Sequence, residues 1–180
     1  EGYTAIKMKV GGGHKADIVC MDAVRNAVGT NVDIMLDANS GFDAPTAIAV
    51  GRHAEKLGVF WLEEPVVPDD LPGYRRIRTA LDGVRLAAGE GEFTVAGFRT
   101  FLEAGLLDVV QPDIARAGGF TGCRRIAALA DAYNVAVAPH TGASGPVCVA
   151  ASLHFAAATP RFLTFEHMYI YNPLHEILAQ

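Results

Sequence analysis

A short apolar run that ends in a charged or polar residue recurs about every 26 residues along the chain. Between these runs lie stretches with helical periodicity, as in Ile18, Met21, Val24 and Val28. Strands and helices that alternate at this repeat length are typical of parallel βαβ units. The runs that we predict as strands are residues 5–10, 33–37, 59–63, 85–90, 108–113, 135–140 and 162–166.

The polar residue at the end of each run decides between two parallel architectures. In a (β/α)₈ barrel the carboxyl ends of all strands converge on one face, which holds the active site. An open doubly wound sheet would spread the same groups along an edge. Because every predicted strand contributes one group, we favour an α/β fold of the (β/α)-barrel kind. The strand ends are Lys9, Asp37, Glu63, Glu90, Asp113, His140 and Glu166.

The chain is short for such a barrel. It has 180 residues, whereas a complete barrel usually needs about 250. It also shows seven strand signals instead of eight. We therefore expect residues 1–180 to be one partial catalytic barrel domain of about seven βα units, a fragment of a longer protein.

Composition excludes several classes of protein. Apolar residues make up 51% and charged residues 19%, which is typical of a soluble globular chain. A net charge of −5 without any Lys/Arg cluster argues against nucleic acid as a partner. No apolar run reaches the about 18 residues of a membrane span, and the first residues resemble no targeting peptide. Cys20, Cys123 and Cys148 lack metal-type spacing, so we expect reduced, packed thiols in a cytoplasmic protein.

Capping residues mark the ends of the predicted helices. Asp43 is an N-cap candidate, Pro45 suits the first turn, and Gly58 follows the helix as a stop. Residues 94–105 and 119–133 repeat this design.

Lys7 and Lys9 form a Lys-x-Lys pair on the first predicted strand. Strand side chains alternate with period two, so both lysines point the same way, with Lys9 nearer the mouth of a barrel. Two ammonium groups inside one barrel repel each other. This repulsion lowers the pKa of each lysine and makes a neutral amine available as a base. The alternative is an exposed edge strand with both lysines directed outward.

Asp37, Glu63 and Glu90 place carboxylates at the ends of three consecutive predicted strands. Hard oxygen ligands on separate rigid elements suit Mg²⁺, which keeps positions open for water or substrate. A single acidic strand end is more often an N-cap or a surface charge, but three at one depth favour a metal site. By alternation Glu63 points inward and Glu64 outward, and Asn39 could contact either the residues that hold the ion or the substrate.

Asp113 and His140 end neighbouring predicted strands. A carboxylate on one imidazole nitrogen would orient the ring and raise its basicity, which leaves the other nitrogen for the substrate. A lone histidine is more often a satisfied core residue, and the nearby acid makes that reading weaker. Glu166 ends the last run, where it could be a fourth ligand or a protonated acid that donates a hydrogen bond.

The glycine run at Gly11-Gly12-Gly13 offers a different interpretation. With Ala16 it matches G-x-G-x-x-A, the dinucleotide fingerprint. The match is weak, because a buried central strand should be apolar and the strand before these glycines carries two lysines.

These residues, in this order, resemble the enolase superfamily and within it the mandelate racemase group. The resemblance covers nearly the whole chain, and its pieces are specific only in combination. They are Lys7-Met8-Lys9, Asp37-Ala38-Asn39, Glu63-Glu64-Pro65, Gly89-Glu90, Gln111-Pro112-Asp113 with Gly118-Gly119, Pro139-His140 and Phe165-Glu166.

The resemblance implies a role for each strand end. It implies that the three carboxylates hold Mg²⁺, that Lys9 and His140 (paired with Asp113) act on opposite faces of the substrate, and that Glu166 binds the substrate carboxylate. Lys7 would assist in catalysis and binding. Muconate lactonizing relatives carry a lysine in place of Asp113, which points to the racemase and dehydratase branch. Family members also have an N-terminal capping domain, which residues 1–180 do not include.

The implied reaction is Mg²⁺-dependent removal of the proton beside a carboxylate, through an enediolate. The segments Trp61 to Pro65, Pro68-Asp69-Asp70 and Gly73-Tyr74 look more like those of acid-sugar dehydratases, lyases of carbohydrate acid catabolism. We therefore expect dehydration of a sugar acid to a 2-keto-3-deoxy acid, by a homo-oligomeric full-length enzyme. The alternatives are a racemase or epimerase of a 2-hydroxy acid, a nicotinamide-binding domain, and a non-catalytic fragment.

Overall fold

A computed structural model describes residues 2–168, 171–174 and 176 of the chain. Strands and helices alternate along it, as the sequence predicts. The chain divides into two compact units, Glu1–Ala87 and Ala88–Gln180.

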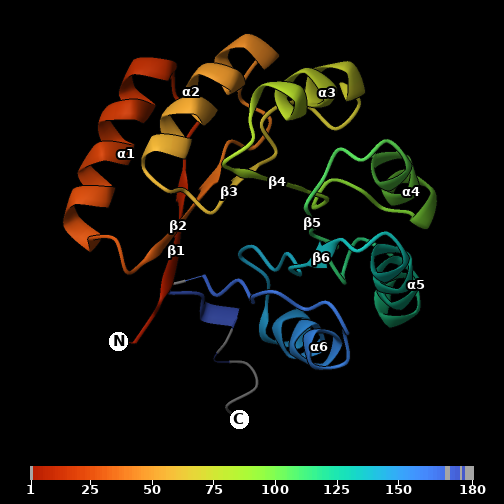
Figure 1. The fold of residues 1–180 in the computed structure, drawn as a ribbon. Helices are drawn as coiled ribbons and strands as arrows, with labels where there is room; N and C mark the ends of the chain where they lie inside the picture. The colour runs from red at the N-terminus through yellow and green to blue at the C-terminus, as the bar shows by residue number, and fades with distance from the viewer. Residues whose placement is uncertain (1, 169–170, 175, 177–180) are drawn as a thin grey trace. The chain divides into compact units, whose positions relative to one another are not determined.

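The first unit consists of parallel strands that pair in chain order, with helices along one face (Figure 1). Helix α1 packs against α2, and α2 packs against α3. The strands are β1 (Ala5–Lys9), β2 (Asp33–Asp37), β3 (Trp61–Glu63) and β4 (Arg85–Ala88). The helices are α1 (His14–Val28), α2 (Ala44–Lys56) and α3 (Leu71–Ala80).

The register of the first three strands places three candidate residues in one row. Lys9 is the partner of Asp37 in the β1–β2 ladder, and Asp37 is the partner of Glu63 in the β2–β3 ladder. Adjacent strands lie about 4.8 Å apart, so these side chains are nearest neighbours at the carboxyl ends. Leu36 and Leu62, one residue before Asp37 and Glu63 on their strands, are fully buried, and by alternation they face the helices.

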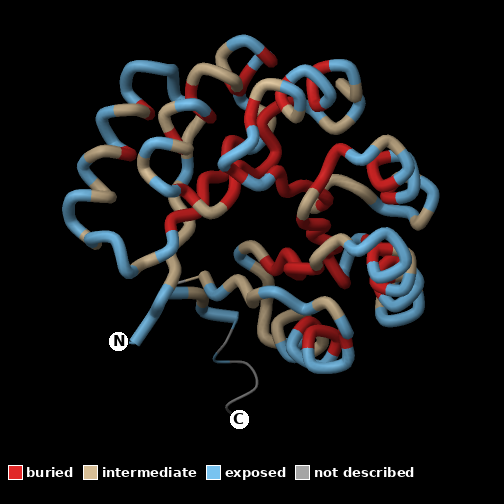
Figure 2. The backbone as a smooth tube through the Cα atoms, in the orientation of Figure 1, coloured by how far each residue is buried: buried red, intermediate tan, exposed pale blue. Residues whose placement is uncertain are grey.

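The second unit repeats the design with shorter strands. Strand β5 (Val109–Val110) pairs in parallel with β6 (Ala136–Val137). Helix α4 packs against α5, and α5 packs against α6. In each unit the buried residues gather in the strands and on the inner sides of the helices (Figure 2). The helices are α4 (Val95–Glu103), α5 (Gly119–Ala132) and α6 (Pro146–Ala157).

The later predicted strands are shorter than expected. Pro112 and Pro139 lie inside runs 108–113 and 135–140, and proline has no N–H to donate to a ladder. Each run therefore forms a two-residue strand, and the two meet again in a single bridge farther along.

The prediction of residues 33–37 as a strand is confirmed at both ends, whereas the other three of the first four predicted strands are shorter by one or two residues at one end, and run 5–10 ends at Lys9. Run 85–90 ends early because Gly89 turns to a φ of 137°, and run 59–63 begins at Trp61.

The seventh predicted strand, residues 162–166, is wrong as an element of its own. Phe162 forms one parallel bridge with Val137, and the Leu163 N–H donates to the Val137 carbonyl at 2.9 Å. The described residues therefore contain six strands, although the direction of this last segment is that of a parallel neighbour of β6.

The predicted helix signals are confirmed where side chains cap the helices. Asp43 accepts a hydrogen bond from the Thr46 N–H at 2.8 Å, with Pro45 in the first turn. Gly58 follows α2 with a φ of 62°, and Thr94 caps α4. No helix in the described part of the chain is long and apolar enough to cross a bilayer.

The three cysteines differ in their surroundings. Cys123 is buried, Cys148 is half-buried and Cys20 is exposed, and all three are free thiols. The expectation of packed thiols is thus wrong for Cys20, which lies on a part of α1 that faces solvent.

Candidate active site

Lys7 and Lys9 lie on the same side of β1, and both contact the carboxylate of Asp37. Lys9 forms an ion pair with Asp37 Oδ2, and its Nζ donates to Asn39 Oδ1 at 2.6 Å. Lys7 Nζ lies 3.5 Å from Asp37 Oδ2 and 2.7 Å from Glu63 Oε1. The Lys9 side chain is 61% exposed and that of Lys7 16%, so Lys9 is the more accessible ammonium. Both ammonium groups therefore contact the acidic strand ends, but the expectation of two ammonium groups in one interior is wrong for Lys9, which is mostly exposed on the first strand of the sheet.

Asp37 and Glu63 are fully buried carboxylates on adjacent strands. Buried like charges repel each other unless positive groups or hydrogen-bond donors lie nearby. Lys7 and Lys9 supply positive charge, and the Asn39 N–H donates to Asp37 Oδ1 at 2.9 Å. The indole N–H of Trp61 donates to Glu63 Oε2 at 3.1 Å. The row at the strand ends is therefore an acidic site arranged to attract cations.

The turn after β2 holds Asn39 in an unusual backbone conformation. Asn39 and Ser40 have φ angles of 41° and 61°, in the left-handed region that non-glycine residues rarely adopt. The turn is fixed by the Ser40 N–H, which donates to the Glu64 carbonyl at 2.8 Å. Glu64 also has a positive φ of 39°, and its side chain is buried, so it is not a solvent-exposed surface charge.

In the second unit, Asp113 and His140 form a buried pair. His140 Nδ1 lies 2.8 Å from Asp113 Oδ2, and the two residues are partners in an isolated parallel bridge. The Ala115 N–H donates to the other oxygen, Asp113 Oδ1, at 2.8 Å. An ionised carboxylate only accepts hydrogen bonds, so the proton of this bond lies on Nδ1. The remaining nitrogen, Nε2, is then available for chemistry.

The surroundings of this pair shift both pKa values. Burial lowers the pKa of His140, but the hydrogen bond with Asp113 and the charges of Glu90 and Glu166 outweigh burial and hold the pKa above its ordinary value. Burial raises the pKa of Asp113, but hydrogen bonds from His140 and the Ala115 N–H hold it below its ordinary value. Both shifts favour a protonated histidine beside an ionised aspartate, which is the form that a general acid needs.

Glu90 lies beside Nε2 of His140, and Arg116 contacts both Glu90 and Asp113. Glu90 Oε2 lies 3.2 Å from His140 Nε2, is buried, and accepts no hydrogen bond from the described residues. Arg116 Nη1 donates to the Glu90 carbonyl at 3.0 Å and lies 3.6 Å from Glu90 Oε1. Its Nε lies 3.8 Å from Asp113 Oδ2. Sequence reasoning missed Arg116, although its place three residues after Asp113 was a usable signal.

Glu166 is tied to the residues that follow His140. Its Oε2 accepts hydrogen bonds from the backbone N–H groups of Thr141 at 2.9 Å and Gly142 at 3.0 Å, and it lies 3.9 Å from His140 Nε2. The Thr141 hydroxyl donates to the Glu166 carbonyl at 3.0 Å. Oε2 of Glu166 is therefore an acceptor for two backbone N–H groups, and the role of Glu166 toward an ion or a substrate stays a prediction. The contribution of Thr141 carries no signal in the sequence.

The backbone N–H groups of the glycine run after β1 already donate to a side chain of α1, the helix that follows them. The buried carboxylate of Asp17 accepts hydrogen bonds from the N–H groups of Gly11, Gly12 and Gly13 at 3.1, 3.3 and 3.2 Å. A dinucleotide pyrophosphate would need these same amides. Asp17 stands in the place of such an anion, which removes the physical basis of the nicotinamide interpretation.

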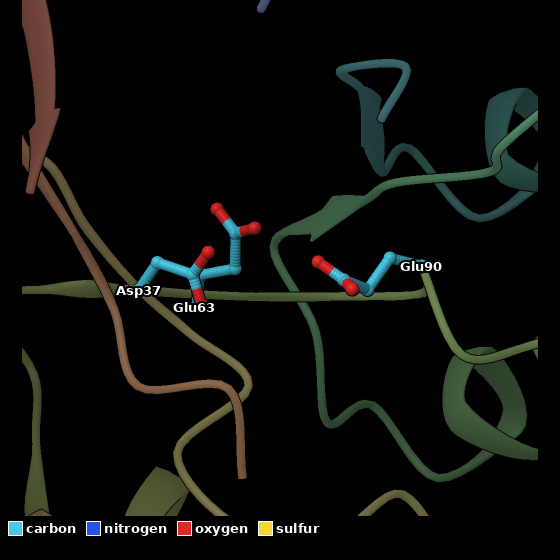
Figure 3. A group of neighbouring side chains, drawn as sticks. All are labelled: Asp37, Glu63 and Glu90. Carbon is cyan, nitrogen blue, oxygen red and sulfur yellow. The ribbon is translucent and has the colours of Figure 1, made fainter. Parts of the chain in front are cut away.

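The three predicted metal ligands offer chemistry that fits Mg²⁺ (Figure 3). Asp37 and Glu63 belong to the first unit, where they are buried partners in one ladder, and Glu90 belongs to the second. The buried Oε2 of Glu90 accepts no hydrogen bond from residues 2–168, 171–174 and 176. Carboxylate oxygens on rigid strand ends are the hard ligands that Mg²⁺ prefers.

The chain is similar in sequence to enzymes of known activity. It is 40% identical over 158 residues to D-galactarolactone cycloisomerase of Agrobacterium fabrum. The matched stretch covers 88% of this chain and 41% of that enzyme. It is 38% identical over 151 residues to D-gluconate dehydratase of Thermoproteus tenax. This second matched stretch covers 84% of this chain and 30% of that enzyme. The chain thus spans well under half the length of these curated relatives.

Its structure is also similar to that of a solved enzyme. A racemase from Streptomyces coelicolor A3(2) with bound magnesium matches with a TM-score of 0.85 and 34% identity, over 92% of this chain and 45% of that one. The model of the Enolase C-terminal domain-like family matches residues 1–180. These findings confirm the resemblance and the α/β, barrel-type fold class predicted from the sequence. The chain belongs to the Enolase C-terminal domain-like family of the enolase superfamily.

Proposed function

We propose that the full-length protein is a lyase that dehydrates a sugar acid to a 2-keto-3-deoxy acid, with Mg²⁺ as its cofactor. The observation that carries the proposal is the buried His140–Asp113 pair, whose free Nε2 lies 3.2 Å from Glu90. The similarity to a D-gluconate dehydratase supports the class of substrate and reaction. The whole enzyme, and not this chain alone, is the species that we expect to be active.

In this proposal, Asp37, Glu63 and Glu90 hold the ion. The positive charge of the ion would stabilise the two oxygens of the substrate carboxylate, which become more negative when the proton on the neighbouring carbon is removed. The magnesium in the related racemase supports the choice of metal. Lys7, Asn39 and Glu166 are the candidates to bind the substrate carboxylate and hydroxyl groups.

The proposed proton transfers use Lys9 and His140. Lys9 removes the proton from the carbon beside the carboxylate, and the electron pair first spreads onto the carboxylate oxygens as an enediolate and then forms a double bond to the next carbon. The hydroxyl on this carbon takes a proton from the His140 imidazolium and departs as water. The resulting enol loses its O–H proton and gains a proton at the carbon that lost the hydroxyl, which gives the 2-keto-3-deoxy acid. The raised pKa of His140 favours the imidazolium that the second step consumes.

A cycloisomerase is the second candidate, because the chain is 40% identical to a D-galactarolactone cycloisomerase. A racemase or epimerase is the third, and the similarity to a racemase structure supports it. All three reactions begin by removing the same kind of proton, so the same residues serve each of them.

Mass spectrometry separates the candidates. The full-length enzyme would be incubated in D₂O with Mg²⁺ and D-gluconate, D-galactonate or D-galactarolactone. Loss of one water with formation of a keto group supports the dehydratase. A new isomer of unchanged composition indicates a cycloisomerase, and deuterium beside the carboxylate without either product indicates a racemase. No change in any of a broad set of sugar acids would contradict the proposal.

Two further tests address the other classes. Titration with NAD(H) should show no binding, because Asp17 already occupies the glycine amides. Sedimentation of the full-length protein would test the predicted homo-oligomer. The cytoplasmic location stays a prediction.

A further inference from the structure

Trp61 is the single tryptophan of this chain and is 3% exposed. It lies two residues before Glu63 on β3, so the two side chains project from the same side of the strand. Its indole N–H donates to Glu63 Oε2 at 3.1 Å, in a buried environment. A buried indole N–H needs an acceptor, and here the acceptor is a proposed metal ligand.

We infer that Trp61 is a positioning residue for metal binding, which orients the Glu63 carboxylate before the ion arrives. This inference rests on the proposed function, in which Glu63 is a ligand. Hydrogen bonds hold both oxygens of Glu63, since Lys7 donates to Oε1 at 2.7 Å and Trp61 donates to Oε2. A flexible glutamate loses rotamer freedom when it binds an ion. A rigid indole that already fixes the carboxylate reduces this cost.

Phe60, the residue before Trp61, is an aromatic side chain that makes no hydrogen bond to Glu63, because phenylalanine has no donor. Phe60 is half-buried, its ring centroid lies 5.7 Å from that of Trp61, and the Arg85 guanidinium lies over its ring at 4.2 Å. Phe60 therefore makes ring and cation–π contacts but has no donor, whereas Trp61 combines a ring contact with a donor aimed at Glu63. Outer partners of this kind typically change metal affinity by about 10- to 100-fold when they are removed.

The test measures Mg²⁺ affinity of the full-length protein by calorimetry, without substrate. Trp61→Phe keeps an aromatic ring and removes the N–H, and we expect the dissociation constant to rise by about 10- to 100-fold. The matched control is Tyr74→Phe. The Tyr74 side chain is also fully buried, and its hydroxyl donates to the Val66 carbonyl at 3.2 Å. The control loses a buried aromatic donor of the same unit, and its Mg²⁺ affinity should stay at the wild-type value.

A second variant separates the hydrogen bond from packing. Replacement of Trp61 by benzothienylalanine, in which sulfur takes the place of the N–H, preserves the shape of the ring system and should weaken Mg²⁺ binding as Trp61→Phe does. Wild-type affinity in either folded variant would overturn the inference and leave the proposed function intact. Absence of Mg²⁺ binding by the wild-type protein would overturn the proposed function itself.

Discussion

His140 and Asp113 meet across a parallel bridge, and their side chains are 2.8 Å apart between Nδ1 and Oδ2. Both side chains are less than 10% exposed. The contact assigns the Nδ1 proton to the bond with Asp113, so only Nε2 can exchange a proton with a substrate. The pair therefore sets both the orientation and the protonation state of the proposed acid.

Replacement of His140 by asparagine should lower turnover of the full-length enzyme by about 10²- to 10⁴-fold, the usual contribution of a positioned acid or base. Asparagine retains polarity but cannot transfer the proton. Steady-state kinetics with the substrate found by the sugar-acid screen would measure the effect. His154→Asn is the matched control, because His154 is an exposed histidine on α6 and its loss should leave turnover unchanged. Equal activity in both variants would refute the role of His140.

The protonation of His140 should be visible in the metal-free protein. Its NMR titration midpoint should lie above 6.5, the ordinary value, because the hydrogen bond with Asp113 and the nearby Glu90 and Glu166 charges outweigh burial. A pKa raised by folding means that protonation stabilises the fold. This contribution to the free energy of unfolding is complete below pH 6.5 and is lost as the pH rises through the folded pKa. Asp113→Asn should lower the midpoint, and a wild-type midpoint at or below 6.5 would contradict this.

Cys123 should be unreactive in the folded protein. Burial, together with the charges of Asp113 and Cys148, raises the pKa of Cys123 to about 12, so almost no thiolate exists near neutral pH. Cys20 is exposed and should be alkylated by iodoacetamide, while Cys123 should react only after denaturation. Peptide mass spectrometry would quantify each site. Alkylation of both cysteines at the same rate without denaturant would disprove this.

Gly89 should tolerate no side chain, because it turns the chain just before Glu90. An added Cβ would lie 2.6 Å from Phe98 Cε1 and 3.0 Å from the Gln111 backbone nitrogen, at a φ of 137°. Gly58 also has a positive φ, of 62°, but nothing lies within 4 Å of its added Cβ. Gly58→Ala should therefore cost only about 1–2 kcal/mol of the free energy of unfolding.

Gly89→Ala should cost at least about 1 kcal/mol more than Gly58→Ala, because backbone strain and overpacking add. It should also weaken Mg²⁺ binding. Thermal denaturation and calorimetry of the two variants would measure both effects. Indistinguishable stability of the two variants would argue against the crowding at Gly89.

The row of Lys9, Asp37 and Glu63 could be predicted from sequence because it depends on local rules. The repeat length places each residue at a strand end, and the period of two fixes its side. The approach of Asp113 to His140 follows from the same rules.

Other features depend on the path of loops and on the ends of ladders. The bond between Asp17 and the glycine amides, and the Thr141 contact with Glu166, require a turn geometry that spacing does not encode. The short length of β5 and β6 could have been predicted from Pro112 and Pro139, because proline has no N–H to donate to a ladder. Predicting the Trp61–Glu63 bond required asking where a buried indole N–H finds its acceptor.

In the full-length enzyme, we expect Asp37, Glu63 and Glu90 to share one divalent ion. The most direct measurement is anomalous diffraction from crystals grown with Mn²⁺ in place of Mg²⁺. We predict one peak that is coordinated by a carboxylate oxygen from each of the three residues. A peak that lacks any of the three, or no peak at saturating Mn²⁺, would contradict the account.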